Sequence, residues 1–182
     1  MQHAIGLLEL TSIARGVQVA DLMLKSADVR MLMAKAISPG KYIAMVAGNV
    51  AAVQQAVQAG EAVCGPMLVD RFVIANVHES VLQAINGVSP IEQRGALGVV
   101  ETFSVAAGIE AADRAIKAAN VSLARLHLAT GIAGKSYMLL MGEVADVETA
   151  VRVASTSAGE KGLLVHAVTV PRPHLDLWRH LF

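Results

Sequence analysis

The chain has 182 residues, of which 54% are hydrophobic and 16% are charged, and its 15 Lys and Arg residues balance its 15 Asp and Glu residues. This length allows one large domain or two small ones, and the apolar fraction is sufficient for a sizeable core. Nucleic-acid binding requires clustered basic residues that neutralise phosphates, so a neutral chain without a basic run is not expected to bind nucleic acid.

The sequence also predicts a soluble, cytosolic protein. No uninterrupted apolar stretch reaches the roughly 18 residues that cross a bilayer, and no basic segment precedes an apolar one at the start, so neither a membrane segment nor a secretory signal is expected. Cys64 is the single cysteine. It cannot form an intrachain disulfide, which fits a reducing compartment.

In the first half, the apolar run at residues 4–10 predicts a buried strand, and Ser12 behind it predicts a helix cap. The helix that follows is predicted to be amphipathic because four apolar residues fall on one face: Ile13, Val17, Ala20 and Leu24. Two strands then flank a turn at residues 38–40, and a second helix over residues 49–63 precedes a last strand over residues 71–77.

The second half repeats this order of elements. Shifted by 92 positions, residues 4–29 align with residues 96–121, and Glu9 and Glu101 are one of several identical pairs. The helix face recurs as well: Val105, Ile109, Ala112 and Ile116. Later in the repeat the shift becomes 94 positions, so the second turn, at residues 130–134, contains two extra residues.

The repeat predicts both the domain organisation and the fold class. A unit of about 90 residues is too long for a solenoid repeat and has the size of a small domain. We therefore predict two sister domains, at residues 1–90 and 91–182, joined near residues 86–95, where glycine, proline and charge interrupt the pattern. The order βαββαβ in each domain predicts an α+β fold, a ferredoxin-like variant with an antiparallel sheet and helices on one face.

Several motifs make each half resemble a bacterial microcompartment shell domain. They are AIGLLEL and ALGVVET in the first strands, KSADV and KAANV beginning at Lys25 and Lys117, the paired GK turns, GEVADVETAV, and VPRPH at residues 170–174. The tandem, unpermuted order is most similar to the T-type shell proteins of propanediol-utilisation compartments. The resemblance implies a homotrimer that imitates a hexagon, tiles edge to edge with other shell proteins, and forms a cytoplasmic shell around encapsulated enzymes.

The resemblance also implies which residues meet a neighbouring tile. Lys25 and Lys117 match the lysine at the family's tile edge, and Arg172 matches an edge arginine whose planar donors cap carbonyl groups across the seam. Asn76 stands in the first copy where Arg172 stands in the second, so we expect two kinds of edge that are not equivalent. Without the resemblance, a lysine near the end of an amphipathic helix is explained by the negative helix terminus alone.

The turns between the paired strands match the family's central pore. The matching residues are Ser38, Pro39, Gly40 and Lys41 in the first copy and Thr130, Gly131, Ile132, Ala133, Gly134 and Lys135 in the second. By themselves, these residues predict an ordinary hairpin connection. Around a three-fold axis, however, each of them would occur three times at one opening, which would serve as a pore for small molecules.

Ser38 is a departure from the T-type pattern. Proteins of this type carry a cysteine at the matching position, and three such thiolates hold a 4Fe–4S cluster in the pore. A serine hydroxyl is a poor substitute for a soft thiolate ligand, so the sequence predicts no cluster or a labile one, and we expect no cofactor. Cys64 lies after the second helix, away from the turn, and is expected to be a small buried apolar residue.

No catalytic set emerges from the sequence, so we predict a structural shell protein and not an enzyme. Glu9 and Glu101 recur on separate domains, where an acid–base pair is not expected, and an equally good role for each is to accept hydrogen bonds from nearby backbone amides. Two alternatives stay open. One is an electron-transfer protein with an iron–sulfur cluster at the trimer axis, and the other is a regulator that binds a small molecule between its tandem domains.

Overall fold

The structure is a computed structural model that describes residues 4–87 and 95–181. In this part of the chain the strands form two four-stranded antiparallel sheets, ordered β2-β3-β1-β4 and β6-β7-β5-β8. The strands of the first sheet are β1 (Ala4–Leu10), β2 (Arg30–Ile37), β3 (Lys41–Gly48) and β4 (Leu68–Ile74). Those of the second are β5 (Ala96–Thr102), β6 (Val121–Leu128), β7 (Ser136–Gly142) and β8 (Leu164–Val170). The predicted domain boundary between residues 90 and 91 lies outside the described residues.

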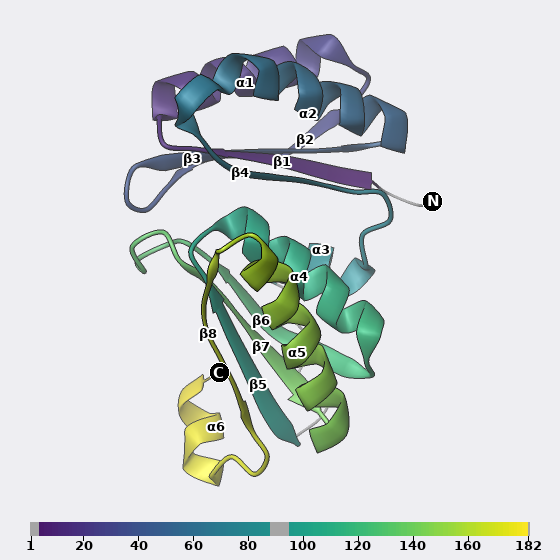
Figure 1. Cartoon of the computed structure of the whole chain (residues 1–182), viewed down its shortest axis with the longest axis vertical. Helices are drawn as coiled ribbons and strands as arrows, with labels where there is room; N and C mark the ends of the chain where they lie inside the picture. Colours follow the sequence, from purple (N-terminus) through teal and green to yellow (C-terminus); the bar gives the residue numbers. More distant parts are fainter. Residues whose placement is uncertain (1–3, 88–94, 182) are drawn as a thin grey trace.

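Two long helices lie along one face of each sheet (Figure 1). They are α1 (Ile13–Ser26) and α2 (Val50–Cys64) in the first half and α4 (Val105–Ala118) and α5 (Val144–Glu160) in the second. A short 3₁₀ turn, η1 (Gly65–Met67), follows α2. The α+β class is thereby confirmed. No helix in the described part of the chain is long and apolar enough to cross a membrane.

A further short helix ends each half and was not predicted. These helices are α3 (Glu79–Ile85) and α6 (Leu175–Leu181), and they pack on the outer faces of the sheets, by which we mean the faces opposite the long helices. A helix of seven residues is too short to display a clear helical period in the sequence. Each sheet therefore carries helices on both faces, and not on one face as predicted.

The two halves also agree in the irregularities of their sheets. In the pairing of β1 with β4 the register shifts after Glu9, and in the pairing of β5 with β8 it shifts after Glu101. The pairs β2–β3 and β6–β7 share a second register shift at matching positions. The halves are therefore copies of one unit in backbone geometry as well as in sequence. A difference in exposure between equivalent residues then reflects what each half contacts.

Serine side chains begin the first long helix of each half, as predicted. Ser12 Oγ accepts a hydrogen bond from the Arg15 amide at 3.3 Å, and Ser104 Oγ accepts one from the Ala107 amide at 2.9 Å. Each bond satisfies one of the amides that a helix leaves without an intrahelical partner. The serine thus fixes the point at which the chain turns from the first strand of a half into its first helix.

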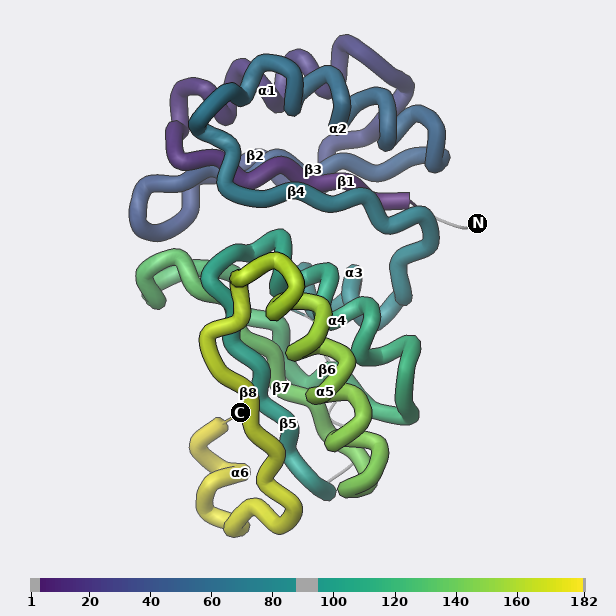
Figure 2. The backbone as a smooth tube through the Cα atoms, in the orientation of Figure 1, coloured from purple at the N-terminus to yellow at the C-terminus, as the bar shows by residue number. Residues whose placement is uncertain are grey.

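The two halves share one hydrophobic core. The outer face of the first sheet, which includes Leu7 and Met45, packs with α4 of the second half, whose Ile109 and Ala112 are fully buried. The inner face of the same sheet packs with α1 and α2. Figure 2 accordingly shows the first sheet between its own helices and the second half. Within the described residues, the outer face of the second sheet is covered in part by α6, around Trp178.

Of the four residues in the apolar stripe predicted for α1, Ala20 is buried, but the other three do not face the sheet in this chain. These three, Ile13, Val17 and Leu24, are 44%, 55% and 44% exposed. The buried residues of α1 are Gly16, Val19, Ala20 and Met23. In α4 the equivalent residues Val105 and Ile109 are fully buried, because this helix packs on its own sheet and on the first half as well. In α4 the stripe is thus part of the contact between the halves, whereas in α1 most of it is exposed.

Candidate functional site

The predicted pore residues of both halves come together where the two turns lie near each other at one side of the molecule (Figure 2). The Gly131 amide donates a hydrogen bond to Ser38 Oγ at 3.3 Å, and Lys41 Nζ donates one to the Gly134 carbonyl oxygen at 3.3 Å. A Cβ atom added at Gly134 would lie 2.8 Å from Pro39 Cδ, so glycine is needed for this approach. The structure thus joins the two turns into one surface.

The remaining predicted pore residues shape the turns themselves. The backbone of Gly40 has a φ of 104°, which favours glycine, and Ala133 adopts a left-handed conformation with a φ of 52°. The Lys135 amide donates to the Ile132 carbonyl oxygen at 3.1 Å. The turns border an open hollow lined by Ala36, Ile37, Ser38, Pro39, Gly40 and Thr130.

The side chains at the turns do not fit an iron–sulfur cluster. Ser38 offers a hydroxyl, which accepts a hydrogen bond from the Gly131 amide, where soft thiolate ligands are required. Cys64 lies in the core of the first half, where its Sγ donates to the Gly60 carbonyl oxygen at 3.2 Å. Burial raises the pKa of this thiol and so disfavours the thiolate. The prediction that Cys64 is a small buried apolar residue is confirmed.

Glu9 is a fully buried carboxylate at the contact between the halves. Its Oε1 atom accepts a hydrogen bond from Lys41, and its Oε2 atom accepts bonds from the amides of Val105 and Ala106 at 2.8 and 3.1 Å. These amides begin α4, where the helix dipole favours an anion. Burial raises the pKa of Glu9, while Lys41 and the two amides act in the opposite direction. The carboxylate ties the first sheet and its turn to α4, which confirms the predicted role of accepting amide hydrogen bonds.

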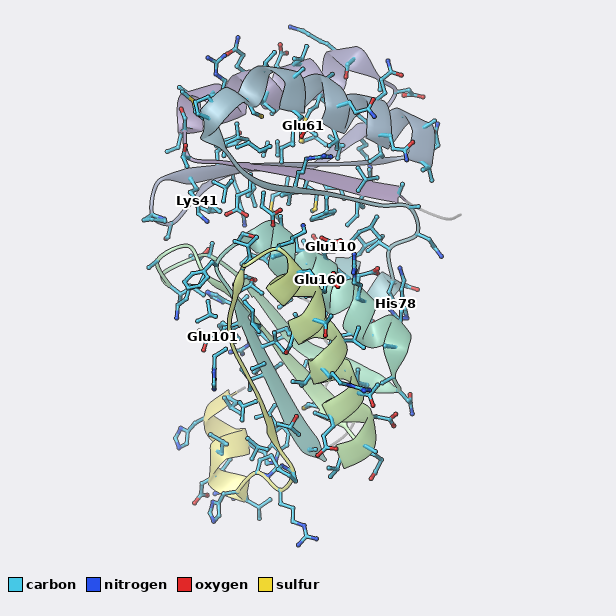
Figure 3. All side chains as sticks on the ribbon, in the orientation of Figure 1. Lys41, Glu61, His78, Glu101, Glu110 and Glu160 are labelled. Carbon is cyan, nitrogen blue, oxygen red and sulfur yellow. The ribbon has the colours of Figure 1, made fainter. Side chains whose placement is uncertain are left out.

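Glu101 is the counterpart of Glu9, but its environment differs. It pairs with Lys135 at 2.9 Å, in the place of the Glu9–Lys41 pair, and the side chains of Glu101 and Lys135 are 34% and 40% exposed. No backbone amide among the described residues donates to it. Figure 3 shows Lys41 at the junction of the halves and Glu101 on the side of the second sheet opposite α4 and α5. The predicted amide contact is therefore missing for Glu101 in the single chain.

A second polar cluster between the halves was not predicted. Asp70 on β4 accepts hydrogen bonds from Ser104 Oγ at 2.7 Å and from Lys161 Nζ at 3.1 Å, and Lys161 also pairs with Glu110 at 2.7 Å. Burial lowers the pKa of Lys161, but Glu110 and Asp70 outweigh it and raise the pKa above its ordinary value. The sequence offered no signal for this cluster, because the residue equivalent to Asp70 in the second half is His166 and the charges do not repeat.

Two of the four predicted edge residues meet within the chain. Lys117 Nζ donates to the carbonyl oxygen of Asn76 and pairs with Asp113 at 2.6 Å. The other two, Lys25 and Arg172, occupy the equivalent positions but are not brought together. Arg172 is exposed, and Lys25 pairs with Asp21 of its own helix, at side-chain exposures of 71% for the lysine and 58% for the aspartate. The contact between the halves thus brings Lys117 and Asn76 together and leaves Lys25 and Arg172 apart.

Comparisons with known proteins identify the unit from which both halves are built. The BMC domain family matches residues 4–77 and 96–173, one match in each half. The bacterial microcompartment shell protein PduT of Citrobacter freundii is 56% identical over 181 residues, which cover 100% of this chain and 98% of the relative. The shell protein PduA of the same organism is 35% identical over 86 residues, which cover 47% of this chain and 89% of the relative. PduA therefore corresponds to about one half of this chain.

A solved structure agrees with this assignment along the whole chain. The crystal structure of a microcompartment protein from Desulfitobacterium hafniense superposes with a TM-score of 0.85 at 46% identity and covers 98% of this chain and 99% of its own. The chain belongs to the BMC domain family of bacterial microcompartment shell proteins. The predicted resemblance, including the tandem order of the two domains, is confirmed.

Proposed function

We propose that this chain is a structural tile of a microcompartment shell, of the PduT type, and that it is not an enzyme. Its similarity to PduT extends over its whole length, with one BMC domain match in each half, at residues 4–77 and 96–173. Groups that could carry chemistry serve the fold instead. Glu9 and Asp70 join the halves, and Cys64 packs in the core.

The proposal rests on one observation. The two surfaces that meet at the contact between the halves each occur a second time in the chain, and there they are exposed. Within the chain, Ile109 on α4 and Phe72 on the first sheet are buried at this contact. Their equivalents Val17 on α1 and Val168 on the second sheet are 55% and 43% exposed. One chain therefore presents both partners of a second, similar contact. They lie on separate halves and do not meet within the chain.

The short helices repeat this asymmetry. α3 packs against β6 of the other half, and its Val81 is fully buried. The equivalent residue of α6, Leu177, is 40% exposed. The strand equivalent to β6 is β2, most of which is exposed or half-buried. Among the described residues, α6 and β2 thus offer a second pair of matching surfaces that stay more exposed than α3 and β6.

A ring of chains pairs all of these surfaces. A contact made by different faces of its two partners passes from chain to chain and closes into a ring when its rotation closes. A ring of six units, as the resemblance implies, contains three chains of two units each, and we propose this homotrimer as the tile. Its six turns, Ser38–Lys41 and Thr130–Lys135 from each chain, surround an axial opening through which small molecules pass.

The outer rim of the tile is the proposed contact with other shell proteins. Lys25, Lys117, Asn76 and Arg172 all lie at the ends of the contacts between units, where the resemblance places tile edges. Because one pair sits within a chain and the other between chains, the two kinds of edge differ. Tiles joined at these edges form the layer that encloses the encapsulated enzymes.

We propose further that the tile holds no iron–sulfur cluster, because Ser38 lacks a thiolate. Anaerobic reconstitution with iron and sulfide tests this against the electron-transfer alternative. The chain is expected to develop no stable visible absorption band, and Ser38→Cys is expected to gain one, since three thiols then meet at the axis. A stable band from the unaltered chain would favour electron transfer.

The tile itself is tested by mass and by microscopy. Light scattering after size-exclusion chromatography is expected to give three times the chain mass, and electron microscopy of concentrated protein is expected to show hexagonal layers. Val17→Asp places a charge on the exposed stripe of α1 and is expected to abolish the trimer. Val50→Asp, on an exposed residue of α2 outside that stripe, is the matched control. An unaltered chain that stays monomeric when concentrated would refute the proposal.

A further inference from the structure

Glu9 accepts hydrogen bonds from the N-terminus of a helix, and its counterpart Glu101 has no such partner among the described residues. Both carboxylates occupy equivalent positions in the first strand of their half, and each pairs with the lysine that follows the neighbouring turn, Lys41 or Lys135. Glu9 also accepts the first two amides of α4. No helix terminus among the described residues donates an amide to Glu101, and its side chain is one third exposed. Glu101 therefore has the ion pair that Glu9 has, but not the hydrogen bonds from helix amides.

The matching helix terminus is present elsewhere in the chain, at the start of α1. Ser12 accounts for two amides of its first turn, because its side chain accepts from Arg15 and its carbonyl oxygen accepts from Gly16. The amides of Ile13 and Ala14, which are equivalent to those of Val105 and Ala106, have no carboxylate acceptor among the described residues. α1 thus offers the same two donors that α4 gives to Glu9.

We propose that Glu101 of each chain accepts hydrogen bonds from the amides of Ile13 and Ala14 of the partner subunit, and so closes the contact between chains as Glu9 closes the contact between halves. This inference rests on the proposed trimer. The partner is a second copy of this chain, and the surface is the exposed stripe of its α1, seated on the outer face of the second sheet. Lys135 balances the charge of Glu101 once the contact excludes water.

We expect Glu101 to contribute more to the contact between chains than Glu9 contributes to the contact between the halves. Between the halves, Asp70 supplies a second carboxylate that accepts from the capping Ser104 and pairs with Lys161. Between chains, the position of Asp70 is taken by His166, which is not an anion. Glu101 is therefore the one carboxylate of this set that the described residues offer to the N-terminus of α1 of the partner subunit. If Glu101 is replaced, no second carboxylate of this set can accept hydrogen bonds in its place.

The test compares Glu101→Gln with Glu9→Gln in the full chain, using native mass spectrometry over a dilution series. Glutamine keeps the size of the side chain but loses the charge that the helix amides favour. We expect Glu101→Gln to weaken trimer association at least tenfold while the circular dichroism and melting of the dissociated chain stay unchanged. Glu9→Gln is expected to lower the melting temperature of the dissociated chain. Glu101→Asp, which keeps the charge, is expected to restore part of the association.

Hydrogen exchange on the unaltered protein provides an outcome that does not depend on a variant. The amides of Ile13 and Ala14 are expected to be protected in the trimer and to lose protection on dilution, whereas those of Val105 and Ala106 stay protected in both. If the unaltered chain forms trimers but Glu101→Gln associates within twofold of it, or these amides exchange freely in the trimer, the role of Glu101 is refuted and the tile is not. An unaltered chain that never associates refutes the tile.

Discussion

The two halves of this chain are copies of one unit, yet equivalent residues are buried in one and exposed in the other. Glu9 is fully buried and Glu101 is 34% exposed, and Ile109 is fully buried where Val17 is 55% exposed. Local sequence is not the cause, because the sheets agree in register and in their irregularities. The cause is the neighbour, since the first sheet has the second half on its outer face. The exposed residues mark the surface that a second chain is proposed to cover.

The strongest way to break this comparison is to place a charge on each of the two apolar stripes. Ile109→Asp buries an unpaired carboxylate in the shared core, and we expect the free energy of unfolding to fall by more than about 4 kcal/mol. Val17→Asp in the dissociated chain is expected to change it by less than about 0.5 kcal/mol, because Val17 is exposed there. Urea denaturation at low protein concentration measures both. Equal destabilisation by the two changes would contradict the assignment of the stripes.

The carboxylates give the next largest effect. Glu9→Ala leaves the amides of Val105 and Ala106 and the ammonium group of Lys41 without their acceptor, and we expect a loss of about 3 kcal/mol in the free energy of unfolding. Glu101→Ala removes a partly exposed ion pair from the dissociated chain, and we expect a loss below about 1 kcal/mol. The same denaturation assay applies. If Glu101→Ala cost as much as Glu9→Ala in the monomer, the two sites would not differ in enclosure.

The pH dependence of stability sharpens the comparison further. Because the pKa of Glu9 is raised above 4.5, the folded chain holds this proton at pH values where the unfolded chain has lost it. The free energy of unfolding contributed by Glu9 is therefore expected to fall as the pH rises from about 4.5 through the raised pKa. Denaturation of the unaltered chain and of Glu9→Gln across this range isolates the effect as a difference in slope. Identical slopes would show that burial does not raise this pKa.

The smallest expected effects belong to the two equivalent lysines. Lys117→Ala removes bonds to the Asn76 carbonyl oxygen and to Asp113, and we expect a cost of about 1 kcal/mol in the free energy of unfolding. Lys25→Ala removes an exposed pair within one helix and is expected to cost less than about 0.5 kcal/mol. Thermal unfolding of the dissociated chains distinguishes them. A larger cost for Lys25→Ala would mean that this lysine has a partner within the chain.

Much of the fold could be predicted because it depends on local features that recur. The capping serines, the short apolar strands and the glycine turns each follow from a few neighbouring residues. The repeat also predicted that the two turns are equivalent, though not that they contact each other through Ser38 and Gly131. The contact between Asp70 and Lys161 could not be predicted, because these residues are far apart in the chain and their charges have no counterpart in the other half.

By itself, the sequence of this protein determined the repeated unit, its α+β elements and its family, because hydrophobic period and turn residues act over short distances. Tertiary structure alone decided which helix face is buried, which of the two glutamates is excluded from solvent, and which lysine forms a hydrogen bond with the other half. These outcomes depend on what packs against a surface. Two copies of one sequence pattern therefore acquire different environments when one of them has a neighbour and the other does not.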